Sequence, residues 1–538
     1  MKNLILGLLI VVPIFLSAQV KFSKDFDITT GNPYRVIDAP VKLYFSVDGK
    51  SAISVKVRGE YVTLQLFDAE KMQEVTRHEY KDFPKYTKIQ DVITIGEKMY
   101  YIFEAFNKKA DNFSVYYREI NRIDATFGKI NKLFTTKGVV VNSKVDPLEK
   151  TTPFSGLGFN SGPKFTVYQS FDQSKIMIAY RNKPKERNDD KNKDVIGVYV
   201  FDSAFNPIWH GEKRMLHTEA DMNNLAYGIS NKGTAYMLTF LNNSKSYALL
   251  AFTESGELKE NKLDIDGKKI VQKFNIKEDE EGNLVFAGFY ANGIDIMVNW
   301  TGNPSWSFNT NGLFYFEMNA NGRVTDIRDF PFSIDFIKQY QTKHQKKKSN
   351  KREAGDKAGI ADLKLIEFNM MNDGSFIFVG EQRYVRNEMY GTSTKTVFHY
   401  AHMVMIKMNK NGELAWMVKL PKNQAGMRGR GSMGAKYMQG NGRHYLLYLD
   451  NEENANISIN QAPKAYKDGA EGFLSAYVID DESGKVNKHL ILSTKNIKGI
   501  RAYQFKTSRI FYLQENTSMF EIYIKGKKDT MVKLELVN

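Results

Sequence analysis

Short apolar segments recur along the chain in pairs joined by tight polar turns, and this pattern constrains the fold more than any other feature. One pair runs from Lys164 to Tyr168, turns at Asp172–Ser174 and continues from Ile176 to Tyr180. Turns such as Asn411-Gly412 are the strongest short-range signal for a β-hairpin, because both central residues need positive φ. Since the rest of the 538-residue chain shows almost no helical period, we expect an all-β protein.

Two kinds of hairpin alternate along the sequence. In the first kind the second strand is almost continuously apolar, as in Phe376–Gly380 and Tyr445–Leu449, which is typical of a strand buried on both faces. In the second kind apolar and polar residues alternate, as expected for an outer hairpin with one wet face. One hairpin of each kind forms a four-stranded antiparallel sheet. Eight such units begin near Lys42, Lys88, Lys164, Asn224, Gln272, Asp362, Ala435 and Ile500.

Repeated four-stranded sheets arranged radially form a β-propeller. The sequence therefore predicts an all-β protein, a β-propeller of about eight four-stranded antiparallel blades, with seven as the alternative because the first and last units are the least clear. The units are spaced by roughly 45 to 90 residues, which is wider than in WD40 repeats.

The long segments of the chain fall at two kinds of connection only. Turns between the first and second strands of a unit, and between its third and fourth strands, are nearly all short. The long connections between second and third strands are 182–194, 290–312, 382–398 and 450–472. The long connections between successive units are 135–162, 331–361 and 421–434. Both kinds emerge on one face of an antiparallel unit, and insertions gathered on one face often mark the binding face of a repeat protein.

The N-terminus is typical of a secretory signal peptide. Lys2 precedes the apolar run Leu4–Leu16, and small residues follow at Ser17 and Ala18. The run is shorter than the roughly 20 residues that a membrane-spanning helix needs, which makes an anchor the less favoured alternative. We expect residues 1–18 to be a cleaved signal peptide and residues 19–538 to be a single propeller domain. The mature chain would be exported, in the periplasm or associated with the outer membrane, with no transmembrane segment.

Charge and cysteine content narrow the classes of function. The formal net charge is +15 and the sequence pI is about 9.3, so the surface suits polyanions such as nucleic acid, anionic lipid or acidic polysaccharide. Nucleic acid does not fit an exported protein, so we do not expect it as a partner. The chain contains no cysteine, which excludes disulfides, a thiolate nucleophile, cysteine zinc sites and a lipoprotein anchor.

Two loops contain candidate binding residues. Trp300 and Trp306 share one long connection, where exposed aromatic rings stack on sugars or anchor a protein partner. Arg428 and Arg430 lie in the glycine-rich segment Gly426–Gly434, where two guanidinium groups could clamp a carboxylate or phosphate. The alternatives are local packing for the tryptophans and a flexible connection for the arginines.

Four further residues complete the candidate binding set: Arg383, Tyr390, His399 and Asp450. The first three lie in or beside the connection 382–398, and Asp450 opens an oxygen-rich segment that lacks the spacing of a known calcium loop. His399 and His402 are three residues apart in an expected strand, so they face opposite ways and do not share a metal ion. We expect no metal site and no cofactor.

A lysine-rich insertion occupies about 331–361. Its segment Gln341–Arg352 contains six lysines and arginines and no acidic residue, and it follows a possible helix start at Ser333–Phe336. Such a segment can touch an anionic surface or a partner. The favoured interpretation is a solvated, partly helical or mobile insertion, since runs of charge usually remain in water.

Three stretches resemble an uncharacterised family of secreted, β-propeller-like proteins of Bacteroidota. They are 311–317 with 330–336, 373–382 with 411–424, and 448–451 with 468–474. The resemblance covers roughly the C-terminal half with some specificity. It implies the fold and export, and it brings no known activity and no catalytic residue.

Two functions remain open. The first is a non-enzymatic binding or scaffold propeller of the cell envelope that engages a protein or glycan through the long-loop face. The alternative is a hydrolase or lyase acting on an acidic polysaccharide, with a site at the central axis of the looped face. Because the sequence contains neither an HExxH nor a GxSxG motif, we favour the first and keep an enzyme as the less favoured alternative.

Overall fold

The computed structural model describes most of the chain. The described residues are 21–143, 163–186, 188–263, 265, 269–271, 275–279, 281–292, 294–298, 304–319, 323–391, 393–427 and 431–537. No helix in this part of the chain is long and apolar enough to cross a membrane.

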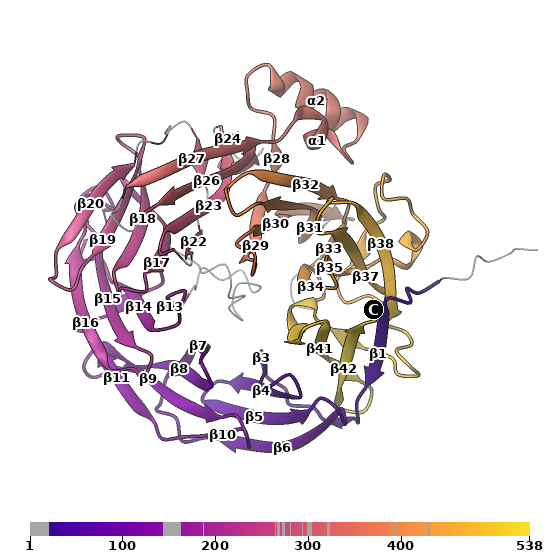
Figure 1. Ribbon diagram of the computed structural model, residues 1–538, viewed down its shortest axis with the longest axis horizontal. Helices are drawn as coiled ribbons and strands as arrows, with labels where there is room; N and C mark the ends of the chain where they lie inside the picture. Colours follow the sequence, from indigo (N-terminus) through magenta and orange to yellow (C-terminus); the bar gives the residue numbers. More distant parts are fainter. Residues whose placement is uncertain are drawn as a thin grey trace, which may run out of the picture.

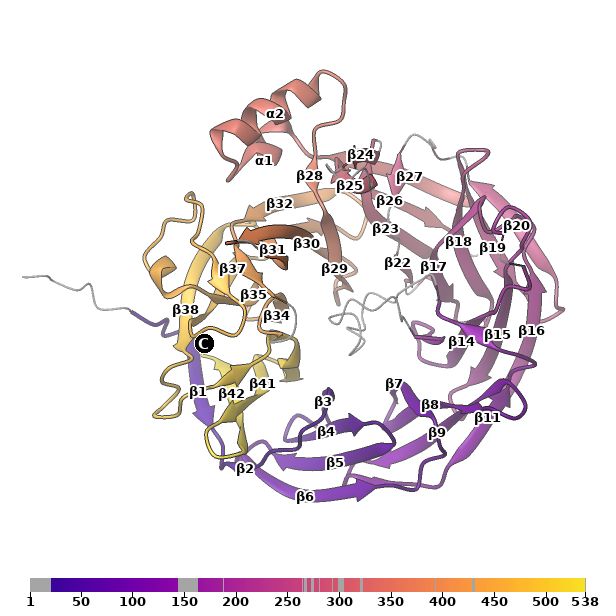
Figure 2. The same cartoon turned by 180° about the vertical axis from the view of Figure 1, so that it is seen from behind.

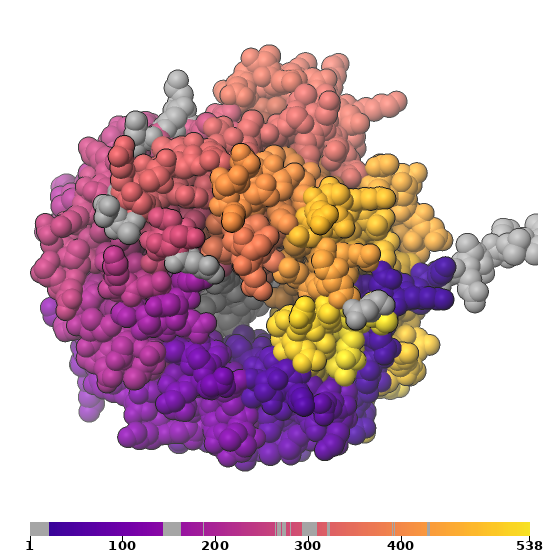
Figure 3. All heavy atoms as spheres, in the orientation of Figure 1, coloured from indigo at the N-terminus to yellow at the C-terminus, as the bar shows by residue number. Residues whose placement is uncertain are grey.

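The protein is all-β apart from one helical insertion, and its sheets form a ring around a central opening (Figure 1). The described residues form nine sheets, of which eight have four to six strands and one has three. Figure 3 shows the same side as a surface that is hollowed at its centre. The predicted all-β class is therefore confirmed.

The eight larger sheets are each built from the centre outwards. Their innermost strands are β3 (Val41–Ser46), β7 (Thr87–Ile95), β13 (Phe165–Gln169) with β12 (Val140–Val141), β17 (Met222–Ile229), β22 (Asn275–Glu278) with β21 (Ile270–Val271), β29 (Leu363–Met370), β34 (Ala435–Gly440), and β39 (Gln504–Phe505) with β40 (Phe511–Gln514). The second strands are β4 (Ser51–Arg58), β8 (Lys98–Asn107), β14 (Lys175–Asn182), β18 (Ala235–Leu241), β23 (Leu284–Ala291), β30 (Phe376–Tyr390), β35 (Arg443–Asp450) and β41 (Thr517–Ile524).

Two more strands complete each of these sheets. The third strands are β5 (Tyr61–Asp68), β9 (Asn112–Asn121), β15 (Val195–Asp202), β19 (Ser246–Phe252), β26 (Gly312–Met318), β31 (Ser393–Met408), β37 (Phe473–Asp480) and β42 (Lys528–Leu536). The outermost strands are β6 (Gln73–Tyr80), β10 (Thr126–Phe127) with β11 (Asn131–Thr135), β16 (Pro207–Arg214), β20 (Leu258–Leu263), β27 (Val324–Pro331), β32 (Leu414–Leu420), β38 (Val486–Ser493), and β1 (Phe26–Thr30) with β2 (Tyr34–Arg35).

Burial follows the two predicted kinds of hairpin. Every residue of β23 is buried, whereas half-buried and exposed residues alternate along β27. Two tryptophans pack between neighbouring sheets. The indole N–H of Trp209 donates to the carbonyl of Gly233, and that of Trp416 donates to the carbonyl of Asp481, each at 2.9 Å.

The N-terminal strand β1 completes the sheet that contains the C-terminal strands. It pairs antiparallel with β42, with Phe26 opposite Leu536 and Thr30 opposite Val532. The two ends of the described chain therefore meet in one sheet, which closes the ring (Figure 2).

The insertions lie at one end of the sheets. Turns between first and second strands, and between third and fourth strands, contain no more than five residues. The longer segments 183–194, 292–311, 332–362, 421–434 and 451–472 all leave from the opposite ends of the strands. We call these two sides the bare end and the looped end. Within the described residues the predicted one-sided distribution of insertions is confirmed, and most of the predicted long connection 135–162 lies outside them.

The lysine-rich insertion is helical. Helix α1 (Ile334–Lys338) begins after Ser333, whose side chain accepts the backbone N–H of Phe336, and α2 (Lys343–Glu353) begins after Thr342 in a capping box with Gln345. Both helices lie outside the ring, near β28 (Ile360–Ala361) and β32, in Figures 1 and 2.

Two connections that the sequence suggested as loops contain strands. β30 and β31 extend as one hairpin to Tyr390 and Ser393, because Val385 opposite Phe398 and Arg386 opposite Val397 continue the pairing. Two short strands extend this hairpin sheet, β33 (Gln424–Gly426) beside β31 and β36 (Tyr466–Lys467) beside β33. The connection 292–311 contains β24 (Ile294–Val298) and β25 (Pro304–Thr310), which form the three-stranded sheet with β28.

Candidate functional site

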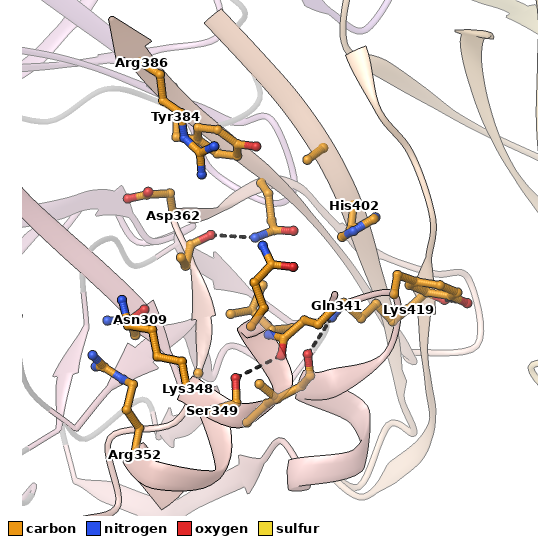
Figure 4. Close-up of a pocket in the computed structure, with 18 of the residues that line it drawn as sticks. Asn309, Gln341, Lys348, Ser349, Arg352, Asp362, Tyr384, Arg386, His402 and Lys419 are labelled. Carbon is orange, nitrogen blue, oxygen red and sulfur yellow. Dashed lines mark hydrogen bonds between the residues drawn. The ribbon is translucent and has the colours of Figure 1, made fainter. Parts of the chain in front are cut away.

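A cavity of about 390 Å³ opens at the looped end, between the helical insertion and the β30–β31 hairpin. Figure 4 shows Arg386 and Tyr384 of the hairpin on one side and Lys348 and Arg352 of α2 on the other. Among the described residues that line the cavity, Asp362 is the one carboxylate. The surplus of cationic side chains favours an anionic ligand.

Lys419 of β32 forms part of the cavity wall and fastens the insertion to the ring. Its buried ammonium group donates to the carbonyl oxygens of Ile337 and Gln339, each at 2.9 Å, and so caps the end of α1. Burial lowers the pKa of Lys419 to about 7. In return, the Tyr340 hydroxyl donates to the backbone carbonyl of Lys419 at 3.1 Å.

His402 lies beside this contact and is held neutral. Burial, followed by the charges of Lys419 and Lys422, lowers the pKa of His402 to about 3. Its Nδ1 accepts the backbone N–H of Lys422 at 3.3 Å, and its ring lies 5.4 Å from the ring of Tyr340. An imidazole with this pKa stays uncharged at neutral pH, so His402 adds no charge to the cavity.

The hairpin presents a stack of three side chains. The ring of Tyr384 stacks on His399 at 4.8 Å between ring centroids, and the guanidinium carbon of Arg386 lies 4.7 Å from the Tyr384 ring. His399 is fixed from its other side by Glu388, whose carboxylate lies 2.9 Å from Nε2. Stacking on an aromatic face orients an arginine without using its hydrogen-bond donors.

A buried ion cluster supports the base of the hairpin. Burial alone would raise the pKa of Glu381, but the charges of Lys422 and Arg383 outweigh burial and lower it. Lys422 Nζ lies 2.7 Å and Arg383 Nε 2.5 Å from the Glu381 carboxylate oxygens. The Arg383 guanidinium also lies 4.9 Å from the ring of Tyr400, which faces it across the hairpin. The cluster fixes the direction in which the hairpin leaves the sheet.

A second cavity of about 520 Å³ lies on the other side of the insertion, and four of its polar side chains bond to one another in pairs. Lys269 Nζ lies 2.8 Å from the Asp329 carboxylate, and the Asn292 amide donates to Asp356 at 2.9 Å. Because these groups already satisfy one another, this cavity offers less to a ligand than the first.

The structure brings three of the candidate residues of the sequence, Arg383, Tyr390 and His399, onto one hairpin. Arg383 belongs to the buried ion cluster and His399 to the half-buried stack, so they have different surroundings. Asp450, at the end of β35, pairs with Lys488 at 2.7 Å and accepts the side-chain amide of Asn454 at 2.7 Å. These contacts fasten the loop that follows β35.

The structure gives only a strand position for two of the candidates and does not describe the last three. Trp306 lies in β25 opposite Ile296, and Tyr390 ends β30 opposite Ser393. Trp300, Arg428 and Arg430 lie outside the described residues. A binding role for all eight candidate residues stays a prediction.

No pattern in the sequence marks Lys419 or His402 as part of a cavity. The contact partners of Lys419 come from about 80 residues earlier in the chain, so no local pattern marks it. Lys348 lies within the run of lysines that the sequence shows, and Arg386 lies in the expected loop. Among the described residues, no group of three or more histidine and carboxylate side chains is placed to hold a metal ion.

No family model matches the sequence, and no curated protein does either. Solved structures similar to the chain include the β-propeller domain of the Trilobed protease from Pyrococcus furiosus, with 10% identity, a TM-score of 0.30, and 85% of this chain and 97% of that one covered. The WD40 domain of SCAP from fission yeast is 6% identical, with a TM-score of 0.36 and 95% and 94% covered. A protein of unknown function from Bacteroides caccae is 10% identical, with a TM-score of 0.24 and 71% and 92% covered.

An acylaminoacyl peptidase is also similar, with 10% identity and a TM-score of 0.34 over 94% of this chain. This chain spans only 58% of the length of that peptidase. These identities and TM-scores assign no activity to the chain.

Proposed function

We propose that the chain is a non-enzymatic binding propeller of the cell envelope, in which each of the eight larger sheets is one blade. It engages a protein or glycan that bears acidic groups, through the looped end. The observation that carries this proposal is the cavity of about 390 Å³, which is lined by Lys348 of α2 and Arg386 of β30.

The groups around the cavity suit recognition rather than chemistry. The ammonium group of Lys419 is occupied by carbonyl oxygens of the insertion, and the Nδ1 of His402 is occupied by a backbone N–H. Lys348 and Arg386 are exposed and project from two rigid supports, a capped helix and a paired hairpin. Fixed cations on rigid elements bind carboxylate, phosphate or sulfate groups at little cost in conformational entropy.

Export belongs to the same proposal. Residues 1–18 lie outside the described residues, and their sequence supports a signal peptide. A mature protein in the periplasm or at the outer membrane would meet acidic glycans and the acidic faces of envelope proteins.

The test is crosslinking capture from the envelope of the cell that makes the protein. The wild type is compared with Lys348→Glu/Arg386→Glu, which reverses both charges at the cavity. The matched control is Lys347→Glu/Lys395→Glu, which makes the same change on the same helix and hairpin at exposed positions that do not line the cavity. A partner captured by the wild type and the control, but lost with the cavity variant, supports the proposal.

The partner is then purified and bound to the three proteins in 50 mM and in 300 mM salt. We expect affinity to fall with salt for the wild type and the control, because charge attraction is screened. If none of the three captures a partner and the purified protein turns over an acidic polysaccharide, the proposal is overturned in favour of a hydrolase or lyase.

A further inference from the structure

Lysines recur at one place on the innermost strands. The second residue of β3, β7, β29 and β34 is a lysine, Lys42, Lys88, Lys364 or Lys436 respectively. Lys164 directly precedes β13, and Lys506 directly follows β39. Each innermost strand enters its sheet from the looped end, so these lysines lie at that end of the strands that surround the central opening (Figure 1).

One group of these lysines lies where the sheet of β7–β9 meets the sheet of β13–β16. Lys88 is directly opposite Glu104 across β7 and β8, and Glu104 is only 2% exposed. The Lys164 ammonium lies 3.9 Å from the ring of Phe113 and close enough for its charge to act on Glu104. Burial raises the pKa of Glu104 to about 7, so two lysines here face one carboxyl group that is only partly ionised.

A second group lies where the ring closes. Lys42 lies 2.7 Å from the Glu521 carboxylate and 3.0 Å from the Asp529 carboxylate, and Lys56 also contacts Glu521. Arg509 lies 3.7 Å from Glu521.

Lys506 adjoins the same group. Burial, and then the charges of Arg509 and Lys42, lower the pKa of Lys506. Asp468 also acts on Lys506, so four cationic side chains, Lys42, Lys56, Lys506 and Arg509, share three carboxylates. The surplus lies in largely buried surroundings, where solvent screens charge weakly.

The two groups lie on four consecutive sheets, which contain β41, β3, β7 and β13 (Figure 1). We propose that Lys42, Lys88, Lys164, Lys506 and Arg509, here called the cationic arc, form a binding site for a small polyanion with several phosphate or carboxylate groups. The arc is separate from the cavity beside α2 and does not depend on it. The buried carboxylates balance the positive charge of only some of these side chains. A multivalent anion would balance the charge of the others.

The test measures binding of tripolyphosphate and of trigalacturonate to the mature protein by isothermal titration calorimetry in low salt. The variant Lys88→Gln/Lys164→Gln removes two charges of the arc and leaves the ion cluster at the ring closure intact. The matched control Lys98→Gln/Lys232→Gln removes two exposed lysines at the bare end. Circular dichroism and thermal melting confirm that all three proteins are folded alike.

We expect saturable binding to the wild type and the control, and about tenfold weaker binding to the arc variant, since each lost contact is a partly desolvated charge pair. Binding of tripolyphosphate alone assigns phosphate groups, and binding of trigalacturonate assigns carboxylate groups. The proposal is overturned by saturable binding of neither probe. It is also overturned by an equal loss of affinity in the arc variant and in the control.

Discussion

Glu521 and Glu104 occupy comparable places in two sheets, and their surroundings shift their pKa values in opposite directions. Both are buried glutamates of a second strand at its junction with the next sheet. Glu521 accepts hydrogen bonds from the hydroxyls of Tyr34 and Tyr44, each at 2.7 Å, and contacts Lys42 and Lys56.

Glu104 lacks this support: its Oε2 has no hydrogen-bond partner within the described part of the chain. Burial alone would raise the pKa of both groups. The lysines outweigh burial at Glu521 and lower its pKa, whereas burial prevails at Glu104 and raises its pKa to about 7. A buried carboxylate thus joins two sheets only where hydrogen-bond donors from the next sheet reach it. At the ring closure, such a junction supplements the pairing of β1 with β42.

The largest effect is expected from Glu521→Gln. The substitution leaves Lys42 and Lys56 buried beside a single carboxylate, Asp529, and we expect it to lower the free energy of unfolding by about 3–5 kcal/mol. Urea denaturation followed by circular dichroism measures the change, with the exposed Glu482→Gln as control. A loss below about 1 kcal/mol would show that Glu521 does not stabilise the closure.

The buried ion cluster at the base of the β30–β31 hairpin should give an intermediate effect. Lys422→Met removes one of the two cations bonded to the buried Glu381, while Arg383 remains beside it. We expect a loss of about 2–3 kcal/mol in the same urea experiment, because a buried carboxylate with one partner left is only partly compensated. A loss as large as that of Glu521→Gln would indicate that Arg383 contributes nothing to this junction.

The effect of Glu104→Gln should depend on pH. The pKa of Glu104 is raised in the folded state to about 7 from an ordinary value of 4.5, so the folded protein binds more protons than the unfolded chain between these values. The stability that this group contributes is fully present below pH 4.5 and is lost as pH rises through 7.

Glutamine mimics the neutral acid at every pH. We therefore expect Glu104→Gln to be more stable than the wild type by about 3 kcal/mol at pH 8 and by less than about 1 kcal/mol at pH 5. Urea midpoints at the two pH values measure this. A difference in stability between variant and wild type that is the same at both pH values would contradict the raised pKa of Glu104.

The smallest effect is expected for an exposed pair. Lys50 and Glu70 lie 3.8 Å apart with both side chains about 70% exposed. Lys50→Ala should change the free energy of unfolding by less than about 0.5 kcal/mol, since solvent and salt screen such pairs. A larger change would mean that burial does not explain why the buried ion pairs stabilise the fold more than this exposed pair.

Much of the fold could be predicted from local patterns. The turns at Gly233, Gly412 and Gly442 have positive φ and join neighbouring strands, as their Asn-rich contexts predict. The strand β1 could not be recognised in the same way. Its partner β42 lies about 500 residues later, and five residues such as Phe26–Thr30 show no distinctive period.

The candidate site was predictable only in its location. The sequence places Arg383 and His399 in one insertion of the looped end, and the structure places them on one hairpin. The cavity itself depends on contacts between α1 and β32 across about 80 residues, so neither Lys419 nor His402 could be assigned to it. Side chains whose partners are this distant have no local signature.

The most direct test of a binding role for the looped end is hydrogen–deuterium exchange of the protein with and without the captured envelope partner. We predict that the partner slows exchange in α2 and in the hairpin formed by the ends of β30 and β31, while the bare-end turns at 230–234 and 409–413 are unchanged. Slower exchange at the bare-end turns, with none at α2 or the hairpin, would contradict it.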